Sequence, residues 1–131
     1  MEKLIKLVEI VLSEYKLDFE LCDSIDNTIC IYDINDKDET HSFFLTISDN
    51  GNSNLMSIIG EYNNEHEKLS IYEKLNAINN SSPFVKVFID ADSNILATHE
   101  FVITKDMEAL RQIVLTNILA YSQVTSTIHL D

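Results

Sequence analysis

The N-terminal residues alternate between apolar and charged side chains with the period of a helix. Apolar side chains recur at intervals of three and four residues, at Leu4, Leu7, Val8, Val11, Leu12 and Tyr15. Positions at these intervals share one side of a helix, whereas Lys6 and Glu9 fall on the other side. The pattern predicts an amphipathic surface helix over residues 2–16.

From Asp18 onward the period falls to two, which is typical of strands that bury one face. The alternation predicts four strands, at residues 19–22, 29–32, 41–48 and 54–62. The Asn50-Gly51 pair predicts a tight hairpin between the last two strands, because these residues tolerate a positive φ. Four consecutive strands indicate an antiparallel meander.

The first of these hairpins contains both cysteines. A turn centred near Asp26 places Leu21 opposite Ile31 and Cys22 opposite Cys30, which keeps one face of the hairpin apolar. Two cysteines do not form a disulfide framework. The favoured interpretation is two small buried or half-buried hydrophobes, and a cross-strand pair that can oxidise is the alternative.

Helical spacing returns after the meander. Asn64, followed three residues later by Glu67, is a candidate N-cap for a helix that must end before Pro83. The apolar positions of this helix are Leu69, Ile71, Tyr72, Leu75 and Ile78. Two further alternating stretches predict strands at residues 84–90 and 95–103.

Thr104 is a candidate cap for a last helix that starts near Asp106 and extends to Ser122. The β-branched stretch at residues 124–128 is ambiguous between a frayed helix end and an extended tail. The order of elements is therefore α-β-β-β-β-α-β-β-α. This order predicts an α+β fold with helices packed on an antiparallel sheet, in a single domain over residues 1–131.

The charge of the chain excludes some partners. Its 131 residues include 22 Asp and Glu against 9 Lys and Arg, for a net charge of -13. Direct binding to nucleic acid and docking to anionic lipid both need a dense cationic face. We therefore expect this chain to bind neither nucleic acid nor a membrane. With no signal-peptide pattern and no apolar stretch long enough to span a membrane, we expect a cytoplasmic protein.

Two segments of the sequence resemble a known family. Leu75-Asn76-Ala77-Ile78-Asn79 precedes a short break, and Phe84-Val85-Lys86-Val87-Phe88-Ile89-Asp90-Ala91-Asp92 follows it. The first segment resembles the Leu-Asn-x-apolar-Asn helix end of the YbjN-like domain family, and the second resembles the strand that closes on an acidic turn there. The amphipathic first helix and the long last helix are also similar. In that turn the family usually has Gly where this chain has Ser93.

This resemblance implies a fold similar to that of type III secretion chaperones. Those proteins are small, acidic and non-enzymatic, usually dimerise, and hold an extended segment of a partner. The resemblance transfers no catalytic residue to this chain.

The strongest charge concentration lies between residues 18 and 39. Its acidic residues are Asp18, Glu20, Asp23, Asp26, Asp33, Asp36, Asp38 and Glu39, and only Lys37 opposes them. Such a field steers basic partners. Most acidic surfaces serve only solubility, so this set is a candidate rather than a motif. The candidate partner-binding residues are Asp23, Asp26, Asp33, Asp36, Asp38 and Glu39.

Metal and catalytic motifs are incomplete. Asp90-Ala91-Asp92-Ser93-Asn94 begins like a calcium loop, but Ile95 and Phe101 occupy the positions that need Gly and Glu. A turn between strands explains these residues. Residues 33–39 are oxygen-rich but lack the same glycine. The four histidines, His41, His66, His99 and His129, have no metal-ligand spacing.

The remaining catalytic candidates are Glu61, Glu65 and His66, near a junction between strand and helix. Since no nucleophile motif accompanies them, we expect a protein that is not an enzyme and that uses no cofactor or metal.

Three functional hypotheses follow. The leading one is a protein-binding, adaptor or chaperone-like module that engages a protein segment on a sheet face, in a helix groove or by strand addition at a sheet edge. A homodimer is a candidate form of this module. The alternative is an acidic inhibitor or immunity-type protein that mimics nucleic acid. A third is a sensor with a small ligand bound between sheet and helices.

Overall fold

The computed structural model describes residues 3–32, 42–62, 68–128 and 130. In chain order its elements are α1 (Leu4–Glu14), β1 (Phe19–Leu21), β2 (Thr28–Tyr32), β3 (Ser42–Ile47), β4 (Asn52–Glu61), α2 (Lys68–Ser81), β5 (Lys86–Ile89), β6 (Asn94–Val102) and α3 (Met107–Ser126). The predicted α+β class and element order are therefore confirmed.

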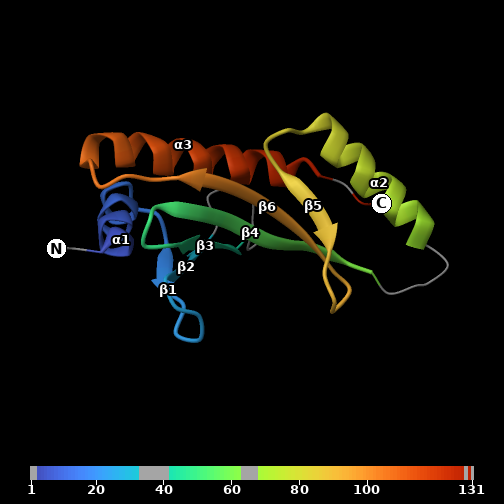
Figure 1. Cartoon of the computed structure of the whole chain (residues 1–131), viewed down its shortest axis with the longest axis horizontal. Coiled ribbons are helices and arrows are strands. Elements are labelled where there is room, and N and C mark those ends of the chain that lie inside the picture. Colours follow the sequence, from blue (N-terminus) through green and yellow to red (C-terminus); the bar gives the residue numbers. More distant parts are fainter. Residues whose placement is uncertain (1–2, 33–41, 63–67, 129, 131) are drawn as a thin grey trace.

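The six strands form one antiparallel sheet in the order β1-β2-β3-β4-β6-β5. Helix α3 runs along one face of this sheet. Helix α1 lies beside the N-terminal half of α3, and α2 lies near β5 (Figure 1). We call the face under α3 the inner face and the opposite face the outer face.

Aliphatic side chains fill the space between the inner face and the helices. The sheet contributes Ile29, Ile31, Leu45, Leu55, Val87 and Ala97. The helices contribute Val8, Val11, Leu12, Leu110, Val114 and Ile118. On the exposed side of the α1–α3 contact, Arg111 donates to both carboxylate oxygens of Glu14 at 2.8 and 3.2 Å. This hydrogen-bonded pair lowers the pKa of Glu14.

A buried hydroxyl group connects α3 to the sheet. The side chain of Tyr121 is fully buried, and its hydroxyl donates to the carbonyl of Ala97 and accepts from the hydroxyl of Ser57, both at 2.7 Å. Burial raises the pKa of Tyr121 to about 12. The phenol is therefore held neutral at a fixed point on two central strands.

Replacement of this tyrosine, Tyr121→Phe, should lower the free energy of unfolding by about 1–2 kcal/mol, because Ser57 and Ala97 lose a buried partner. Below pH 10, the ordinary pKa of tyrosine, the neutral Tyr121 hydroxyl makes its full contribution to the free energy of unfolding. This contribution is lost as the pH rises toward 12, the raised pKa of the buried group. Urea unfolding at pH 8, 10 and 11 should therefore show that the unaltered protein loses its advantage in free energy of unfolding over Tyr121→Phe as the pH rises. A constant difference would contradict this role for the hydroxyl.

The hairpin predicted at Asn50-Gly51 is present, and the positive φ falls on Gly51 at 93°. The Gly51 carbonyl accepts from the amide of Ile103 at 2.9 Å. A Cβ atom at Gly51 would lie 2.3 Å from the carbonyl oxygen of Ile103. Glycine is therefore required here both by the backbone conformation and by the close approach of the chain that leads into α3.

The predicted register of the first hairpin was wrong. Leu21 pairs with Ile29 rather than Ile31, and the amide of Cys22 donates to the carbonyl of Thr28. Cys22 and Cys30 are therefore not opposite each other. The turn closes earlier than predicted, because Asn27 adopts a left-handed φ of 57°. A shift of two residues preserves which side chains share a face, so the apolar alternation alone could not exclude it.

The prediction that Thr104 caps the last helix was also wrong. Helix α3 begins at Met107, and its cap position is Asp106, whose carbonyl accepts from the amide of Leu110 at 2.8 Å. At its other end the helix continues to Ser126, so most of the ambiguous stretch is helical. The predicted N-cap of α2, Asn64 with Glu67, lies outside the described residues.

The end of α2 closes one edge of the sheet. The side-chain oxygen of Asn79 accepts from the amide of Val87 at 2.8 Å, and its amide group donates to the carbonyl of Val87 at 3.0 Å. Leu75 is buried one turn earlier. The Leu-Asn-Ala-Ile-Asn segment therefore acts as an anchor that packs α2 and occupies the backbone amide and carbonyl of Val87 on edge strand β5.

The variant Asn79→Ala should lower the free energy of unfolding by about 1–3 kcal/mol, because both backbone groups of Val87 lose their partner. Asn76→Ala is the matched control, since Asn76 is exposed on the same helix. Its effect should stay within about 0.5 kcal/mol. Chemical denaturation of both variants measures the difference, and equal effects would contradict the anchor.

Candidate functional site

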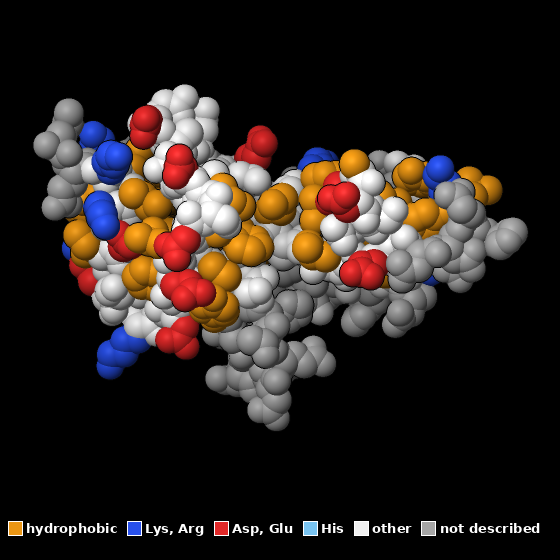
Figure 2. Space-filling view, turned by 90° about the horizontal axis from the view of Figure 1, so that it is seen from below, with side chains coloured by type: hydrophobic (Ala, Val, Ile, Leu, Met, Phe, Trp, Pro, Cys, Tyr) orange, Lys and Arg blue, Asp and Glu red, His pale blue; other side chains and the backbone are white. Residues whose placement is uncertain are grey.

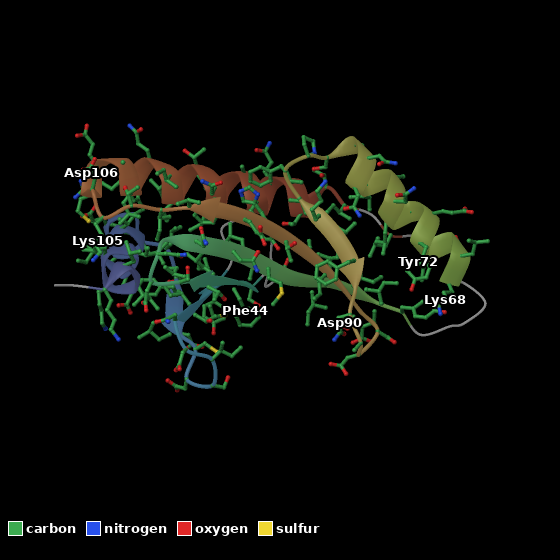
Figure 3. The ribbon with its side chains drawn as sticks, viewed as in Figure 1. Phe44, Lys68, Tyr72, Asp90, Lys105 and Asp106 are labelled. Carbon is green, nitrogen blue, oxygen red and sulfur yellow. The ribbon has the colours of Figure 1, made fainter. Side chains whose placement is uncertain are left out.

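Apolar side chains also gather on the outer face of the sheet. They come from β2, β3, β4, β5 and β6, and we call them the outer apolar strip: Cys30, Phe44, Met56, Ile58, Phe88 and Leu96. The strip lies opposite the face that α3 covers, and Figure 3 shows Phe44 on the side of the strands away from α3. Among the described residues, no helix packs over it.

The pairing of the strands makes the strip continuous. Phe44 faces Cys30 on one neighbouring strand and Met56 on the other. Ile58 follows Met56 by two positions, so both point to the same face. Leu96 lies between Ile58 and Phe88. The strip therefore crosses five strands obliquely without a gap in side-chain neighbours.

Part of the strip is open to solvent. Ile58 is 59% exposed and Phe88 is 43% exposed, whereas Cys30 and Leu96 are covered by their neighbours. Figure 2, the view from below α3, shows hydrophobic side chains extending along this face between acidic ones, with Lys and Arg at its margins. A contiguous apolar surface that is partly exposed is a candidate site for a partner.

Acidic side chains surround the strip. Glu20 pairs across from Cys30, Glu100 lies on the outer face beside Asn54, and Glu61 lies there beside Asn94. Among the described outer-face residues that pair with a residue of a neighbouring strand, Lys86 is the only cation, and it lies opposite Thr98. The hydroxyl of Tyr32 donates to the Glu20 carboxylate, and this hydrogen bond raises the pKa of Tyr32.

A polar groove of about 720 Å³ adjoins the strip on the same face. Its lining includes Asp26, Asn27, Thr46, Asn54 and Glu100. The side-chain oxygen of Asn54 is buried there and has no hydrogen-bond partner among the described residues. The groove thus places two carboxylates and several amide and hydroxyl groups beside the apolar surface.

Of the six predicted partner-binding residues, the structure describes two. Asp23 and Asp26 are exposed in the turn between β1 and β2, at one end of the sheet. The other four, Asp33, Asp36, Asp38 and Glu39, lie outside the described residues. Asp26 reaches the polar groove, so at least this residue belongs to the surroundings of the strip.

The turn at Asp90 is a strand-to-strand turn, as the sequence predicts. A side-chain oxygen of Asp90 accepts from the amides of Asp92 and Asn94, both at 2.9 Å. Ser93 adopts a φ of 64°, in the left-handed region. Glycine adopts this conformation more readily than serine does, because it has no Cβ. Figure 3 shows Asp90 at this turn.

The variant Ser93→Gly should raise the free energy of unfolding by about 0.5–1 kcal/mol, because glycine adopts this φ without a Cβ clash. Ser70→Gly in helix α2 is the control and should lower stability instead. Thermal and urea unfolding measure both. A destabilised Ser93→Gly protein would show that the turn is held by the serine itself.

No described group of three or more His, Cys, Asp and Glu side chains is arranged to hold a metal ion. His99 lies between the rings of Phe84 and Phe101. Its Nδ1 is 2.8 Å from the carbonyl of Phe84 and its Nε2 is 2.7 Å from Oδ1 of Asn117. Both nitrogens are thus engaged in structural hydrogen bonds. Of the catalytic candidates, the structure describes only Glu61, which is exposed.

A second pocket, of about 520 Å³, lies where α2 meets the end of β4. The amine of Lys74 donates to the carbonyl of Leu130 at 3.0 Å, and a Cβ at Gly60 would lie 2.9 Å from the side chain of Leu130. The C-terminal leucine therefore packs against the sheet at this pocket. This is the described region that corresponds to the predicted small-ligand site between sheet and helix.

Sequence reasoning missed the outer apolar strip, although the sequence contains a signal for it. Phe43-Phe44-Leu45 and Ile95-Leu96-Ala97 place apolar residues at consecutive positions of a strand, so both faces must be apolar there. Only the pairing of the strands shows that these second-face residues meet each other.

Comparison with solved structures shows that this fold is similar to that of type III secretion chaperones. The chaperone SycH of Yersinia pestis, in complex with a fragment of YscM2, superposes with a TM-score of 0.53 at 14% identity, over 95% of this chain and 98% of that chain. A chain of the ExoU–SpcU complex from the type III secretion system of Pseudomonas aeruginosa has a TM-score of 0.51 at 18% identity, over 91% and 95%.

The chain itself belongs to the YbjN family. Residues 5–117 match this family, whose description is "Putative bacterial sensory transduction regulator". The crystal structure of YbjN from E. coli has a TM-score of 0.61 at 16% identity, over 95% of this chain and 92% of that one. By sequence, no curated protein matches significantly. In the described part of the chain, no helix has the length and apolar character needed to cross a membrane.

Proposed function

We propose that this protein is a non-enzymatic binding module that holds a segment of another protein on the outer face of its sheet. The observation that carries the proposal is the outer apolar strip, which five strands build and no described helix covers. The likeness to chaperones seen in complex with protein fragments supports the same class of function.

The sheet face supports this proposal better than the sheet edges do. On the β5 edge, the side chain of Asn79 already occupies both backbone groups of Val87, at the middle of a four-residue strand. The opposite edge, β1, is only three residues long, so an added strand would gain few hydrogen bonds. The face instead offers a broad apolar surface, and burial of such a surface is the main source of binding free energy.

Self-association would use a different surface. Leu69 and Tyr72 on α2 are 71% and 47% exposed and lie apart from the strip on the sheet. A homodimer formed through α2 would leave the strip free for a partner. The net charge of -13 opposes pairing of the acidic outer faces of two copies.

Mimicry of nucleic acid is the second candidate function, and it receives less support. A mimic needs carboxylates in a continuous row, whereas the described acids on the outer face flank an apolar strip. Asp23 and Asp26 lie in a turn at one end of this face. The acidic turn remains the surface through which such an inhibitor would act.

Site-specific photo-cross-linking in the native cells tests the proposal. Benzoylphenylalanine replaces Phe44 or Phe88 in the strip, or Leu119, a control that is 50% exposed on α3. We expect both strip positions to form adducts with the same protein and the control to form none. A fourth position, Ile25, which is 54% exposed in the acidic turn, reports the mimic.

The pattern of adducts separates the candidates. Adducts at Ile25 alone would support the inhibitor instead of the segment-binding module. Absence of any protein adduct at Phe44 and Phe88, with an unchanged fold by circular dichroism, would overturn the proposed function.

A further inference from the structure

We infer that the outer apolar strip takes a cationic amphipathic helix of a partner protein, about 13 residues long. The inference rests on the proposed function and specifies the chemistry and conformation of the bound segment. Three features of the outer face carry it: its length, its lack of backbone partners and the sign of its rim.

The length of the strip sets the length of the segment. It extends from Cys30 on β2 to Phe88 on β5, with β3, β4 and β6 between them. Four intervals between neighbouring strands span about 19 Å. A helix rises 1.5 Å per residue, so about 13 residues, or three to four turns, reach from end to end.

The composition of the strip favours a helix over an extended chain. An extended segment on a sheet face needs partners for its own amide and carbonyl groups. Phe44, Met56, Ile58, Phe88 and Leu96 offer no donor or acceptor in their side chains. A helix satisfies its backbone internally and presents only side chains, so it can cover this surface without leaving buried polar groups unpaired.

The acidic side chains around the strip indicate that the bound helix is positively charged. Glu100 and Asp26 lie on the side of the polar groove, and Glu61 lies beyond Ile58 on the other side. Glu20 lies at the β1 end, and Lys86 on β5 is the single described cation among the paired outer-face positions. Lys or Arg residues along both flanks of an apolar stripe complement this arrangement.

The probe is a 14-residue peptide, acetylated and amidated, with leucine at helical spacing and lysine elsewhere. Fluorescence anisotropy measures its binding to the full chain, and circular dichroism measures its helicity. We expect saturable binding, a gain of helicity on binding, and weaker binding as salt rises. The same peptide with glutamate in place of lysine, and one broken by central prolines, should bind at least about tenfold more weakly.

Two variants of the protein locate the binding site. Ile58→Lys adds a positive charge on the outer face, at a side chain that is 59% exposed. Leu119→Lys adds the same charge on α3, at a side chain that is 50% exposed. Ile58→Lys should weaken binding by about tenfold or more, and Leu119→Lys should leave it close to that of the unaltered protein. Unchanged thermal midpoints confirm that both variants fold.

The inference is overturned if both variants bind equally, if the glutamate peptide binds as well as the lysine peptide, or if the peptide binds without gaining helicity. Such a result leaves the proposed function intact when Phe44 and Phe88 still cross-link a native protein. Loss of those cross-links would instead remove the proposed function itself.

Discussion

The packing of three helices against a single face of the sheet is the constraint on which the other features depend. Tyr121 and the aliphatic residues of α3 and α1 bury the inner side chains of the central strands completely. A sheet of six strands has two faces, and the helices in the described part of the chain cover only one of them. The outer face must therefore be polar, be covered by a partner, or remain partly apolar and exposed.

Here the outer face combines two of these outcomes. Acidic and polar side chains lie on the outer face next to the apolar strip. Unbranched thioether side chains such as that of Met56 adapt their packing to different surfaces. The partly exposed apolar strip gives a physical reason for the proposed binding of a protein segment.

Polar contacts determine which surfaces stay available. Asn79 occupies the backbone of β5, and Ser57 and Ala97 hold the Tyr121 hydroxyl at the centre of the inner face. Each contact replaces water on a buried or edge group by a protein partner. As a consequence, the inner face is closed and the backbone of Val87 at the edge next to α2 is occupied, whereas part of the outer apolar strip stays exposed.

The sequence by itself determined the elements and their order, because apolar periodicity reflects burial and Gly51 and Pro83 terminate elements locally. It also placed the Asp90 turn, where short-range hydrogen bonds decide the conformation. The register of the first hairpin and the strip containing Phe44 were decided only by tertiary structure. A shift of two residues leaves the periodicity unchanged, and side chains from five strands become neighbours only when the strands pair.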